Sequence, residues 1–502
     1  MSSIEVSCGG KVHTVSVNDG ETLLASLRKA GFSIPAACGG RGKCGKCRVK
    51  LNNVARLACK VIPSDGDTVE LPEAAGGAIL TDTVGITAPA SAQSGIAAAV
   101  DLGTTTVAVR IYDLKNAAEL KTLSAWNKQA AYGGDVISRI RYTMDEPDGL
   151  RELSGIIRRQ TEDLTLAALA DCGRDKSELR GVFLAGNTVM QHIFAGLPVR
   201  SIATAPFKPE TLFLAPTGDT LLGAELNYSP CVAGYVGGDI TAGLLASKLC
   251  AAEGSSLFLD IGTNGEMALV NGGRVSCCAV ASGPAFEGAG ISCGMPALTG
   301  AVSHVRYDRG FLYDVIGAAK PRGICGSGLI DLAAALLRLG CIDPGGRLLP
   351  PEKAPERLRR YIRPDGQGNG VFYLTENVYL TAADVRGLQL AKAAVAGGIE
   401  VLLARQGIAV SELDRVCLAG GFGNYIDPKS AMVIGMLPEL STDKLRCLGN
   451  TSLAGASMAA VDPECRREIC SCAEKCEYIE LSGLREFTEA FTDNMTFDTM
   501  ED

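Results

Sequence analysis

Four cysteines near the start of the chain have the spacing of a metal-cluster site. They read Cys38-x5-Cys44-x2-Cys47-x11-Cys59, and three of them lie in the segment CGGRGKCGKC. Thiolate sulfur is a soft ligand that binds iron well, and four thiolates complete the ligand set of a two-iron cluster. The intervening glycines let a loop curl around such a cluster and point backbone N–H groups at its sulfurs. The pattern therefore predicts one [2Fe-2S] cluster.

Two other kinds of site compete with a cluster as interpretations of this segment. Residues 40–45, GRGKCG, match the dinucleotide-binding pattern G-x-G-x-x-G. That motif needs a strand before it and a helix after it, whereas this segment leads into RVKLNN, so the context argues against a nucleotide. A structural zinc site also takes four cysteines, but such sites usually pair two C-x2-C knuckles and this segment has one. Iron is favoured, and zinc stays open as the alternative.

A second set of residues with recognisable chemistry occurs twice along the chain. The hairpin-like segments GIAAAVDLGTTTVAVRIYDL and SSLFLDIGTNGEMALVNGG both centre on Asp-(Leu/Ile)-Gly-Thr, at Asp101 and Asp260. Two copies at a domain-sized separation predict a duplicated α/β unit with a cleft between its halves. The turn N–H groups and polar side chains can cradle phosphate oxygens; the residues concerned are Gly103, Thr104, Thr105, Gly262, Thr263 and Asn264. The two aspartates can face each other and hold Mg²⁺, largely through its waters.

A third segment completes the predicted nucleotide site. RVCLAGGFGNYID reads as a strand that runs into Gly420, Gly421, Phe422 and Gly423, and such a turn can pass under an adenine ring without a side-chain clash. The chain has no G-x-x-x-x-G-K-[ST] motif, so it is not a P-loop protein. Glu287, in GPAFEG, could position the attacking water, and Asp260 is its rival for that role.

The elements that must position these residues can be read from the patterns around them. Residues 4–17 read as a hairpin, 21–31 as a short helix and 61–71 as a closing strand, which is the β-grasp order of a ferredoxin. Periodic segments at 133–144, 151–173, 326–340 and 382–407 suit helices, and we expect their Arg and Lys side chains to face solvent. The predicted organisation is a trimmed ferredoxin-like domain (1–75), a flexible linker (76–94), lobe I (95–250), lobe II (251–490) and an acidic tail (491–502).

Composition narrows the class of protein. The chain has 502 residues, 47% hydrophobic and 21% charged, and a net charge of −8. This acidic balance argues against a nucleic-acid partner, which would call for a basic face. The first residues lack a basic start and an apolar run, and the first hundred residues hold no good membrane span. We expect a cytoplasmic protein with no membrane partner, whose other cysteines are reduced thiols or ligands.

The remaining cysteines and one histidine leave alternatives open. Cys465, Cys470, Cys472 and Cys476 lie in a stretch that reads as a helix with three of them on one face, so buried or half-buried thiols are favoured over a second cluster. We expect small core residues at Cys277, Cys278, Cys293 and Cys325. His192 is either a satisfied core histidine or a residue near the cleft or the partner.

Several segments carry a resemblance to known families. The cysteine segment resembles adrenodoxin-like ferredoxins, although the gap of eleven residues before Cys59 is far shorter than usual there. The two aspartate hairpins and the glycine turn resemble the ASKHA superfamily of acetate and sugar kinases, Hsp70 and actin. The combination resembles the reductive activators of corrinoid proteins, and five segments carry that likeness at residue level: 184–198, 235–247, 282–302, 323–332 and 418–428.

The resemblance implies a fold and a function. The implied fold is an α+β β-grasp [2Fe-2S] ferredoxin domain followed by a duplicated α/β ASKHA ATPase of two lobes. The implied function is ATP-dependent transfer of one electron to a corrinoid protein, which returns Co(II) to Co(I) for methyl transfer. Because lobe I is expected to begin near residue 95, no room is expected for the extra middle domain that some members carry.

Other functions remain open. They are an activator of another low-potential metalloenzyme, a small-molecule kinase with a redox-sensing domain, and an electron carrier whose lobes are inert. The sequence leaves the corrinoid partner, the low-potential electron donor and a homodimeric state undetermined.

Overall fold

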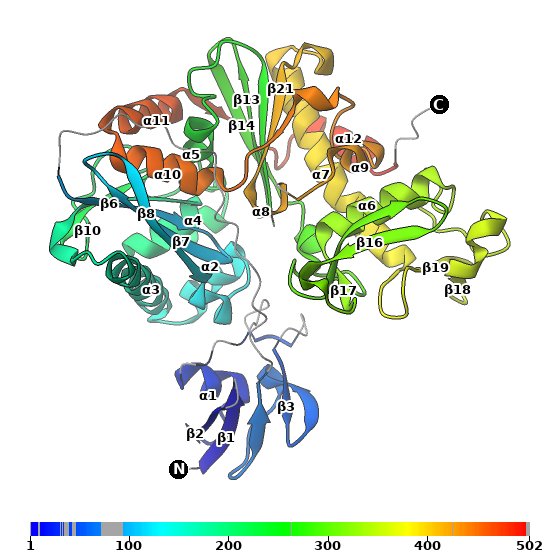
Figure 1. Ribbon diagram of the computed structural model, residues 1–502, viewed down its shortest axis with the longest axis horizontal. Coiled ribbons are helices and arrows are strands. Elements are labelled where there is room, and N and C mark those ends of the chain that lie inside the picture. Colours follow the sequence, from blue (N-terminus) through cyan, green and yellow to red (C-terminus); the bar gives the residue numbers. More distant parts are fainter. Residues whose placement is uncertain are drawn as a thin grey trace. The chain divides into compact units, whose positions relative to one another are not determined.

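The computed structural model describes residues 2–8, 11–30, 32, 34, 40–42, 47–71, 94–262, 264–423 and 425–497 (Figure 1). These residues form two compact units. The first holds the described residues up to 239 together with 456–466, and the second holds 240–455 together with 467–497. The predicted linker, apart from Ser94, lies outside the described residues.

The N-terminal residues form the predicted β-grasp domain, a five-stranded sheet with one helix. The strand order is β2-β1-β5-β3-β4; the elements are β1 (Ser2–Cys8), β2 (Lys11–Val17), α1 (Leu23–Lys29), β3 (Arg48–Leu51), β4 (Val54–Leu57), η1 (Ala58–Lys60) and β5 (Thr68–Glu70). The Thr22 side chain caps α1 by accepting from the Ala25 backbone N–H. Alternate residues of β1, Ile4 and Val6, are buried with the leucines of α1, which is the period expected of a half-buried strand.

Lobe I is built on a six-stranded mixed sheet in the order β10-β11-β9-β6-β7-β8. Its strands are β6 (Ile96–Leu102), β7 (Thr106–Asp113), β8 (Ala118–Trp126), β9 (Leu179–Gly186), β10 (Thr220–Leu221) and β11 (Ala224–Tyr228). Every residue of β6 is buried, as expected for a central strand. The helices are η2 (Lys128–Ala131), α2 (Val136–Asp145), α3 (Gly149–Asp171), η3 (Lys176–Glu178), α4 (Thr188–Ala195) and η4 (Arg200–Ala203).

Lobe II repeats this plan. Its sheet has the order β22-β21-β12-β13-β14-β23, with β12 (Ser256–Ile261), β13 (Gly265–Asn271), β14 (Arg274–Val280), β21 (Arg415–Ala419), β22 (Leu445–Cys447) and β23 (Cys476–Tyr478). Each sheet contains three strands that are consecutive in sequence and antiparallel: β6-β7-β8 in lobe I and β12-β13-β14 in lobe II. In each sheet the first of these three strands also pairs with a parallel strand, β6 with β9 and β12 with β21. The duplication predicted from the two aspartate hairpins is therefore present as a repeated sheet topology.

The rest of lobe II consists of helices and two small sheets, in the orders β16-β15-β17 and β18-β19-β20. The strands are β15 (Ala301–Tyr307), β16 (Phe311–Val315), β17 (Gly323–Ile324), β18 (Ile362–Pro364), β19 (Gly370–Tyr373) and β20 (Tyr379–Leu380). Its helical segments are η5 (Pro284–Glu287), η6 (Ile316–Ala318), α6 (Gly326–Arg338), η7 (Glu356–Tyr361), α7 (Ala382–Gln406), η8 (Val410–Glu412), α8 (Gly420–Gly423), α9 (Pro428–Val433), η9 (Thr442–Lys444) and α12 (Arg485–Asp493). Three further helices, α5 (Gly238–Ala246), α10 (Thr451–Val461) and α11 (Pro463–Lys475), each contain a point where the chain passes from one unit to the other.

Two helices bear on the expectations about membrane spans and about the acidic tail. Helix α7 is long and apolar enough to cross a membrane, but 78% of its apolar window is buried inside the protein, and its residues contribute to the core of lobe II. Helix α12 continues to Asp493, so the first residues of the predicted acidic tail are helical, while residues 498–502 lie outside the described residues.

Candidate functional site

A tight hairpin brings the last two cysteines of the predicted cluster site together. Strands β3 and β4 pair with Arg48 opposite Leu57, and the turn between them places Asn52 and Asn53 at φ of 48° and 64°. Two successive positive φ angles are the mark of a type I′ turn, which tolerates asparagine. The Cys47 carbonyl accepts from the Ala58 N–H at 2.8 Å, so the chain returns to Cys47 immediately before Cys59.

The sulfurs of this pair lie close enough to serve one metal centre. The Cys47 and Cys59 Sγ atoms are 3.3 Å apart, with Cys47 buried and Cys59 partly buried. Gly40 lies alongside at φ 86°, and a Cβ there would come within 3.2 Å of Leu24 Cδ2, so the close approach of this loop favours glycine. Two adjacent sulfurs beside a glycine loop fit a thiolate-held cluster. Cys38 and Cys44 lie outside the described residues.

Asp101 lies near the end of the central strand of lobe I. Its Cα pairs with Ala108 of β7 on one side and Ala185 of β9 on the other, and the residue is 8% exposed. Leu102 ends β6, and the predicted phosphate loop, Gly103 to Thr105, follows directly. The carboxylate and the loop are thus held at one sheet edge, where the carboxyl ends of β6 and its parallel neighbour β9 meet.

Three polar side chains from outside the motif hold this loop in place. Asn127 donates through Nδ2 to the Gly103 carbonyl at 2.9 Å, and its backbone N–H donates to the Thr105 carbonyl at 2.8 Å. Asn187 donates through Nδ2 to Thr104 Oγ1 at 3.0 Å, while its own Oδ1 caps helix α4 by accepting from the Met190 N–H. The loop therefore has a fixed shape before any ligand binds.

The third residue, Arg139 of α2, is completely buried. Its guanidinium donates to the carbonyls of Thr104 and Gly133 and to Gln129 Oε1. Burial lowers the pKa of Arg139 to about 9, against which the nearby Asp135 acts in the opposite direction. We expected the cationic side chains of this helix to face solvent, and for Arg139 that expectation is wrong.

None of these three residues was identified from the sequence. Asn187 had the clearest signal in the sequence. It directly follows the buried strand β9 and caps the start of helix α4, and a polar residue at such a junction is a recognisable helix start. Arg139 sits in an amphipathic helix pattern, and only the tertiary structure shows that it faces inward. Asn127 follows β8 with no motif around it.

In lobe II, Asp260 lies against the glycine turn that follows β21. The Asp260 Cα pairs with Ala419, and a Cβ on the next residue, Gly420, would come within 2.3 Å of Asp260 Oδ1. Gly420 also has φ of 79°, so a side chain is excluded by both conformation and space. The predicted turn is in fact the one-turn helix α8, in which Gly421 is exposed; the Phe422 side chain lies outside the described residues.

Among the other predicted residues of lobe II, Gly262 and Asn264 lie in the loop directly after the strand of Asp260, and Glu287 lies in the separate segment η5. The Gly262 N–H donates to the Asn264 carbonyl at 2.8 Å, and the Ser282 hydroxyl donates to the Gly262 carbonyl at 3.3 Å. Thr263 lies outside the described residues. Glu287 is exposed at the end of η5, so its carboxylate can reach solvent.

The histidine and cysteines outside the motifs are mostly core residues. His192 is buried, its Nδ1 lies 2.7 Å from the Thr188 carbonyl, and burial lowers its pKa, as in a satisfied core histidine. Cys277, Cys278 and Cys325 are buried as expected, whereas Cys293 is only partly buried. Within the part of the chain that the structure describes, no group of three or more His, Cys, Asp or Glu is arranged to hold a metal ion.

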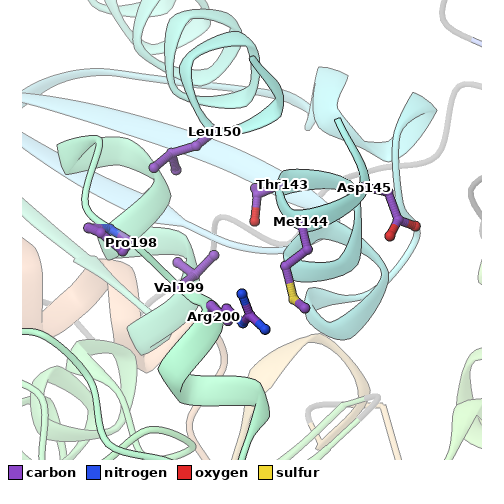
Figure 2. Close-up of a pocket in the computed structure, with 7 residues that line it drawn as sticks. All are labelled: Thr143, Met144, Asp145, Leu150, Pro198, Val199 and Arg200. Atoms are coloured by element: carbon purple, nitrogen blue, oxygen red, sulfur yellow. The ribbon is translucent and has the colours of Figure 1, made fainter. Parts of the chain in front are cut away.

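A surface pocket of about 410 Å³ lies elsewhere on lobe I (Figure 2). Helix α2 supplies Thr143, Met144 and Asp145 to its lining. Pro198 and Val199 line it from just before η4, and Arg200 is the first residue of η4. It includes none of the predicted site residues, so it is separate from the loop that Asn187 and Arg139 hold.

Comparison with known proteins identifies the chain. Residues 6–81 match the 2Fe-2S iron-sulfur cluster binding domain, 96–252 the RACo middle region, and 254–502 the C-terminal domain of RACo, the ASKHA domain. The chain is 33% identical over 429 residues to the corrinoid activation enzyme RamQ of Eubacterium limosum, covering 80% of this chain and 70% of that protein. The chain belongs to the corrinoid reductive activator family.

Two further comparisons support membership of the corrinoid reductive activator family. The chain is 26% identical over 417 residues to the [Co(II) methylated amine-specific corrinoid protein] reductase of Methanosarcina barkeri, covering 75% and 72% of the two chains. A solved structure of a reductive activator for corrinoid, iron-sulfur protein superposes with a TM-score of 0.69 at 29% identity and covers 99% of both chains. This activator therefore has a [2Fe-2S] ferredoxin domain and a nucleotide-binding ASKHA domain.

The comparison also places one region of the family on this chain. The family's middle region matches residues 96–252, and the absence of an extra domain between the linker and lobe I stays a prediction. That region corresponds here to the predicted lobe I, so it is one half of the duplicated fold.

Proposed function

We propose that this protein is an ATP-dependent reductive activase that returns the cobalt of a corrinoid protein from Co(II) to Co(I). The observation that carries the proposal is the union, in one chain, of a 2Fe-2S domain and an ASKHA domain across the length shared with named corrinoid activation enzymes. When bound, the cluster supplies one electron at a low potential, roughly −400 mV for a ferredoxin-type centre. Restoring Co(I) consumes that one electron, and an external low-potential donor replaces it.

ATP has to act through binding in this proposal. An electron at that potential does not easily fill a cobalt centre of lower potential, so the nucleotide must favour one state of the activator and its partner over another. A nucleotide that binds one conformation of the lobes more tightly changes the affinity for the corrinoid protein by linkage. Hydrolysis then resets the activator and releases the partner.

Residues of this chain have defined roles in that cycle. Asp101 and Asp260 hold Mg²⁺ through its waters, and the loops at 103–105 and 262–264 contact phosphate oxygens. The α8 turn, Gly420 to Gly423, lies under the adenine, and its close approach to Asp260 supports a shared site in lobe II. Glu287, an exposed carboxylate, orients the attacking water, with Asp260 as the alternative.

The cluster site follows the same logic. Cys38, Cys44, Cys47 and Cys59 supply the four thiolates, and the adjacent sulfurs of Cys47 and Cys59 support one shared centre. The partner is a corrinoid protein of a methyltransferase system, with no nucleic-acid or membrane partner. A cytoplasmic location and the oligomeric state stay predictions.

The test is an anaerobic mixture of the reduced activator, MgATP and a candidate corrinoid protein in the Co(II) state. The cobalt absorption spectrum should change to that of Co(I) only when all three are present. Cys47→Ser should abolish the change, whereas Cys447→Ser, at an exposed cysteine outside the ferredoxin domain, should behave as the wild type. Equal Co(I) formation with and without ATP would contradict the proposal.

A further inference from the structure

Three arginines of lobe II lie over aromatic rings at the protein surface. Each guanidinium carbon is within about 6 Å of a ring centre, the range of a cation–π interaction. The pairs are Arg357 with Tyr307 at 5.7 Å, Arg360 with Tyr361 at 5.0 Å and Arg363 with Tyr373 at 4.3 Å. All three arginines are exposed, and within the described residues none of them forms an ion pair with a carboxylate. We call these three arginines the arginine face.

The helix η7 places two of these arginines side by side. In a 3₁₀ helix residues three apart lie on the same side, so Arg357 and Arg360 are neighbours. Phe311 joins the two rings beneath them, with its ring centre 5.1 Å from that of Tyr307 and 5.3 Å from that of Tyr361. Both guanidiniums therefore lie on one aromatic cluster, and Arg360 also donates to the Tyr361 hydroxyl at 3.2 Å.

The third arginine lies on one face of the sheet β18-β19-β20. Ile362 pairs with Phe372, which pairs with Leu380, and all three are buried in the core of lobe II. Because side chains alternate along a strand, the residues next to them point to the opposite face. These residues are exposed or half-buried; they are Arg363, Val371, Tyr373 and Tyr379. The outer face of this sheet thus carries two tyrosines, with an arginine over one of them.

The charge of this part of lobe II is opposite to that of the whole chain. Residues 353–363 hold five cationic side chains and one carboxylate, which gives 5 − 1 = +4, whereas the chain carries −8. Two carboxylates border the segment, Glu352 and Asp365. Asp365 accepts from the backbone N–H groups of Gln367 and Asn369, at 2.7 and 3.0 Å, so it is engaged within its own turn. A cationic surface of this kind fits a partner whose contacting surface is acidic.

We propose that the arginine face binds an acidic surface of the corrinoid protein. The proposal rests on the proposed function, from which it takes the partner. Tyrosine and arginine are among the residue types most enriched where protein–protein interfaces gain most of their binding energy. An arginine held over a ring is ordered before binding, so less side-chain entropy is lost when its N–H groups reach a carboxylate.

The arginine face gives the ASKHA domain a defined part in the reaction. Complementary charges speed association and fix orientation more than they slow dissociation, and salt weakens their effect. Lobe II then holds the corrinoid protein, while the ferredoxin domain on its predicted linker approaches the cobalt.

The test is an anaerobic binding titration of the full-length holoprotein with a candidate corrinoid protein, at low and at physiological ionic strength. Arg363→Glu should weaken binding on the order of tenfold at low ionic strength, and the difference should shrink as salt is added. Arg274→Glu is the matched control, because Arg274 is an exposed arginine at the start of β14 and its substitution changes the net charge equally. It should bind as the wild type does.

A second pair of variants tests the ring beneath the arginine. Tyr373→Ala removes the ring and should weaken binding roughly threefold, since exposed cation–π contacts are modest. Tyr373→Phe keeps the ring and should restore the affinity of the wild type. Melting temperatures recorded in parallel show whether a variant has lost its fold.

Each outcome bears on the arginine face separately from electron transfer. Equal affinities for Arg363→Glu and Arg274→Glu, or wild-type binding that does not respond to salt, would overturn the inference. So would a wild type that binds no candidate corrinoid protein, or an Arg363→Glu variant that changes only self-association. A wild type that binds the corrinoid protein but forms no Co(I) contradicts the proposed function instead, and the two glutamate variants still decide the arginine face.

Discussion

Arg139 and Asn187 stabilise the same loop by different chemistry. Arg139 places a cation in the interior. Four neutral acceptors, one of them the Met190 sulfur, replace its lost hydration, and within the described residues no carboxylate is hydrogen-bonded to its guanidinium. A buried charge whose hydrogen bonds all go to neutral acceptors, and which the nearby Asp135 offsets only through space, leaves a partly positive field at the loop, which complements phosphate oxygens. Asn187 instead fixes a single side chain, the Thr104 hydroxyl, and ties it to the start of α4.

This division of labour gives a prediction for Asn187→Asp. The carboxylate keeps the acceptor that caps α4, so the free energy of unfolding should change by less than about 1 kcal/mol. It loses the donor to Thr104 and adds a negative charge, so ATP binding should weaken about tenfold, or ~1.4 kcal/mol. Calorimetric titration with nucleotide measures the effect. Asn116→Asp is the matched control, because Asn116 is exposed and also accepts from a backbone N–H; equal affinities for both variants would contradict the role.

His304 provides a pH-dependent prediction in lobe II. Its Nδ1 lies 3.1 Å from the Asp331 carboxylate, and this hydrogen bond is the main cause of its raised pKa, with burial acting against it. Because the folded-state pKa is raised, the pair stabilises the protein fully below the unfolded value of about 6.5, and the gain disappears as the pH rises through the folded value.

The expected stabilisation is on the order of 0.5 kcal/mol, since the imidazole is 40% exposed and solvent screens the pair. The melting temperature of His304→Gln should therefore fall below that of the wild type near pH 6 and approach it near pH 8.5. A difference that is the same at both pH values would contradict the assignment.

At the scale of elements, the β3–β4 hairpin controls how Cys59 approaches Cys47. Its turn requires positive φ at both Asn52 and Asn53. Asn52 also uses its side chain, donating to Asp67 Oδ1 and accepting from the Thr68 N–H, so Asn53 is the residue that can be exchanged without breaking a described side-chain bond. The short gap between the cysteines is thus filled by the smallest hairpin that returns the chain.

Asn53 therefore allows a matched pair of variants. Asn53→Gly should preserve or raise the melting temperature, because glycine adopts positive φ freely. Asn53→Val should cost about 1–2 kcal/mol in the ferredoxin domain, since a β-branched residue is strained there. Iron content per chain after anaerobic purification should fall only for the valine variant. Full iron retention by Asn53→Val would show that the turn does not control the ligand pair.

Much of the fold could be read from the sequence, because strands and hairpins leave local patterns. The alternation in residues 4–17 and the buried runs before Asp101 and Asp260 predicted β1, β2, β6 and β12 correctly. What the sequence did not reveal depends on tertiary contacts. Arg139 looks like any cation on a helix until the fold turns it inward.

Asp101 and Asp260, one near the end of a strand in each repeated sheet, allow a test of the predicted two-lobe nucleotide site. Asp101→Ala and Asp260→Ala should each reduce MgATP hydrolysis by about 100-fold or more, because phosphoryl transfer depends on positioning and charge neutralisation. The visible spectrum of the cluster should stay unchanged in both. Asp314→Ala, at an exposed ion pair with Arg306, serves as the control for loss of a surface carboxylate. Near-normal hydrolysis in both variants would remove the two-lobe nucleotide site.

At the scale of the whole molecule, the central question is how nucleotide turnover and electron transfer are coupled. The predicted linker, residues 76–94, is rich in Ala, Gly, Ser and Thr. A flexible coil of that length has an r.m.s. reach of roughly 25 Å, which suits a small domain that moves to a partner. Coupling through the partner, with no rigid connection from cluster to nucleotide, is the mechanism that such a linker favours.

This mechanism predicts that the two activities can be separated by mutation. Cys44→Ser should block cobalt reduction yet leave ATP hydrolysis stimulated by the corrinoid protein, because the ASKHA lobes and their partner surface are intact. Asp260→Ala should leave reduction of the cluster by dithionite normal yet stop reductive turnover, because the nucleotide can no longer change the affinity for the partner. The decisive measurement is the cluster potential of the isolated protein with and without MgATP, which should agree within about 30 mV, roughly half of the 59 mV that marks a tenfold change for one electron. A larger shift would mean direct intramolecular coupling, and a ferredoxin domain that moves freely to its partner could not then explain the use of ATP.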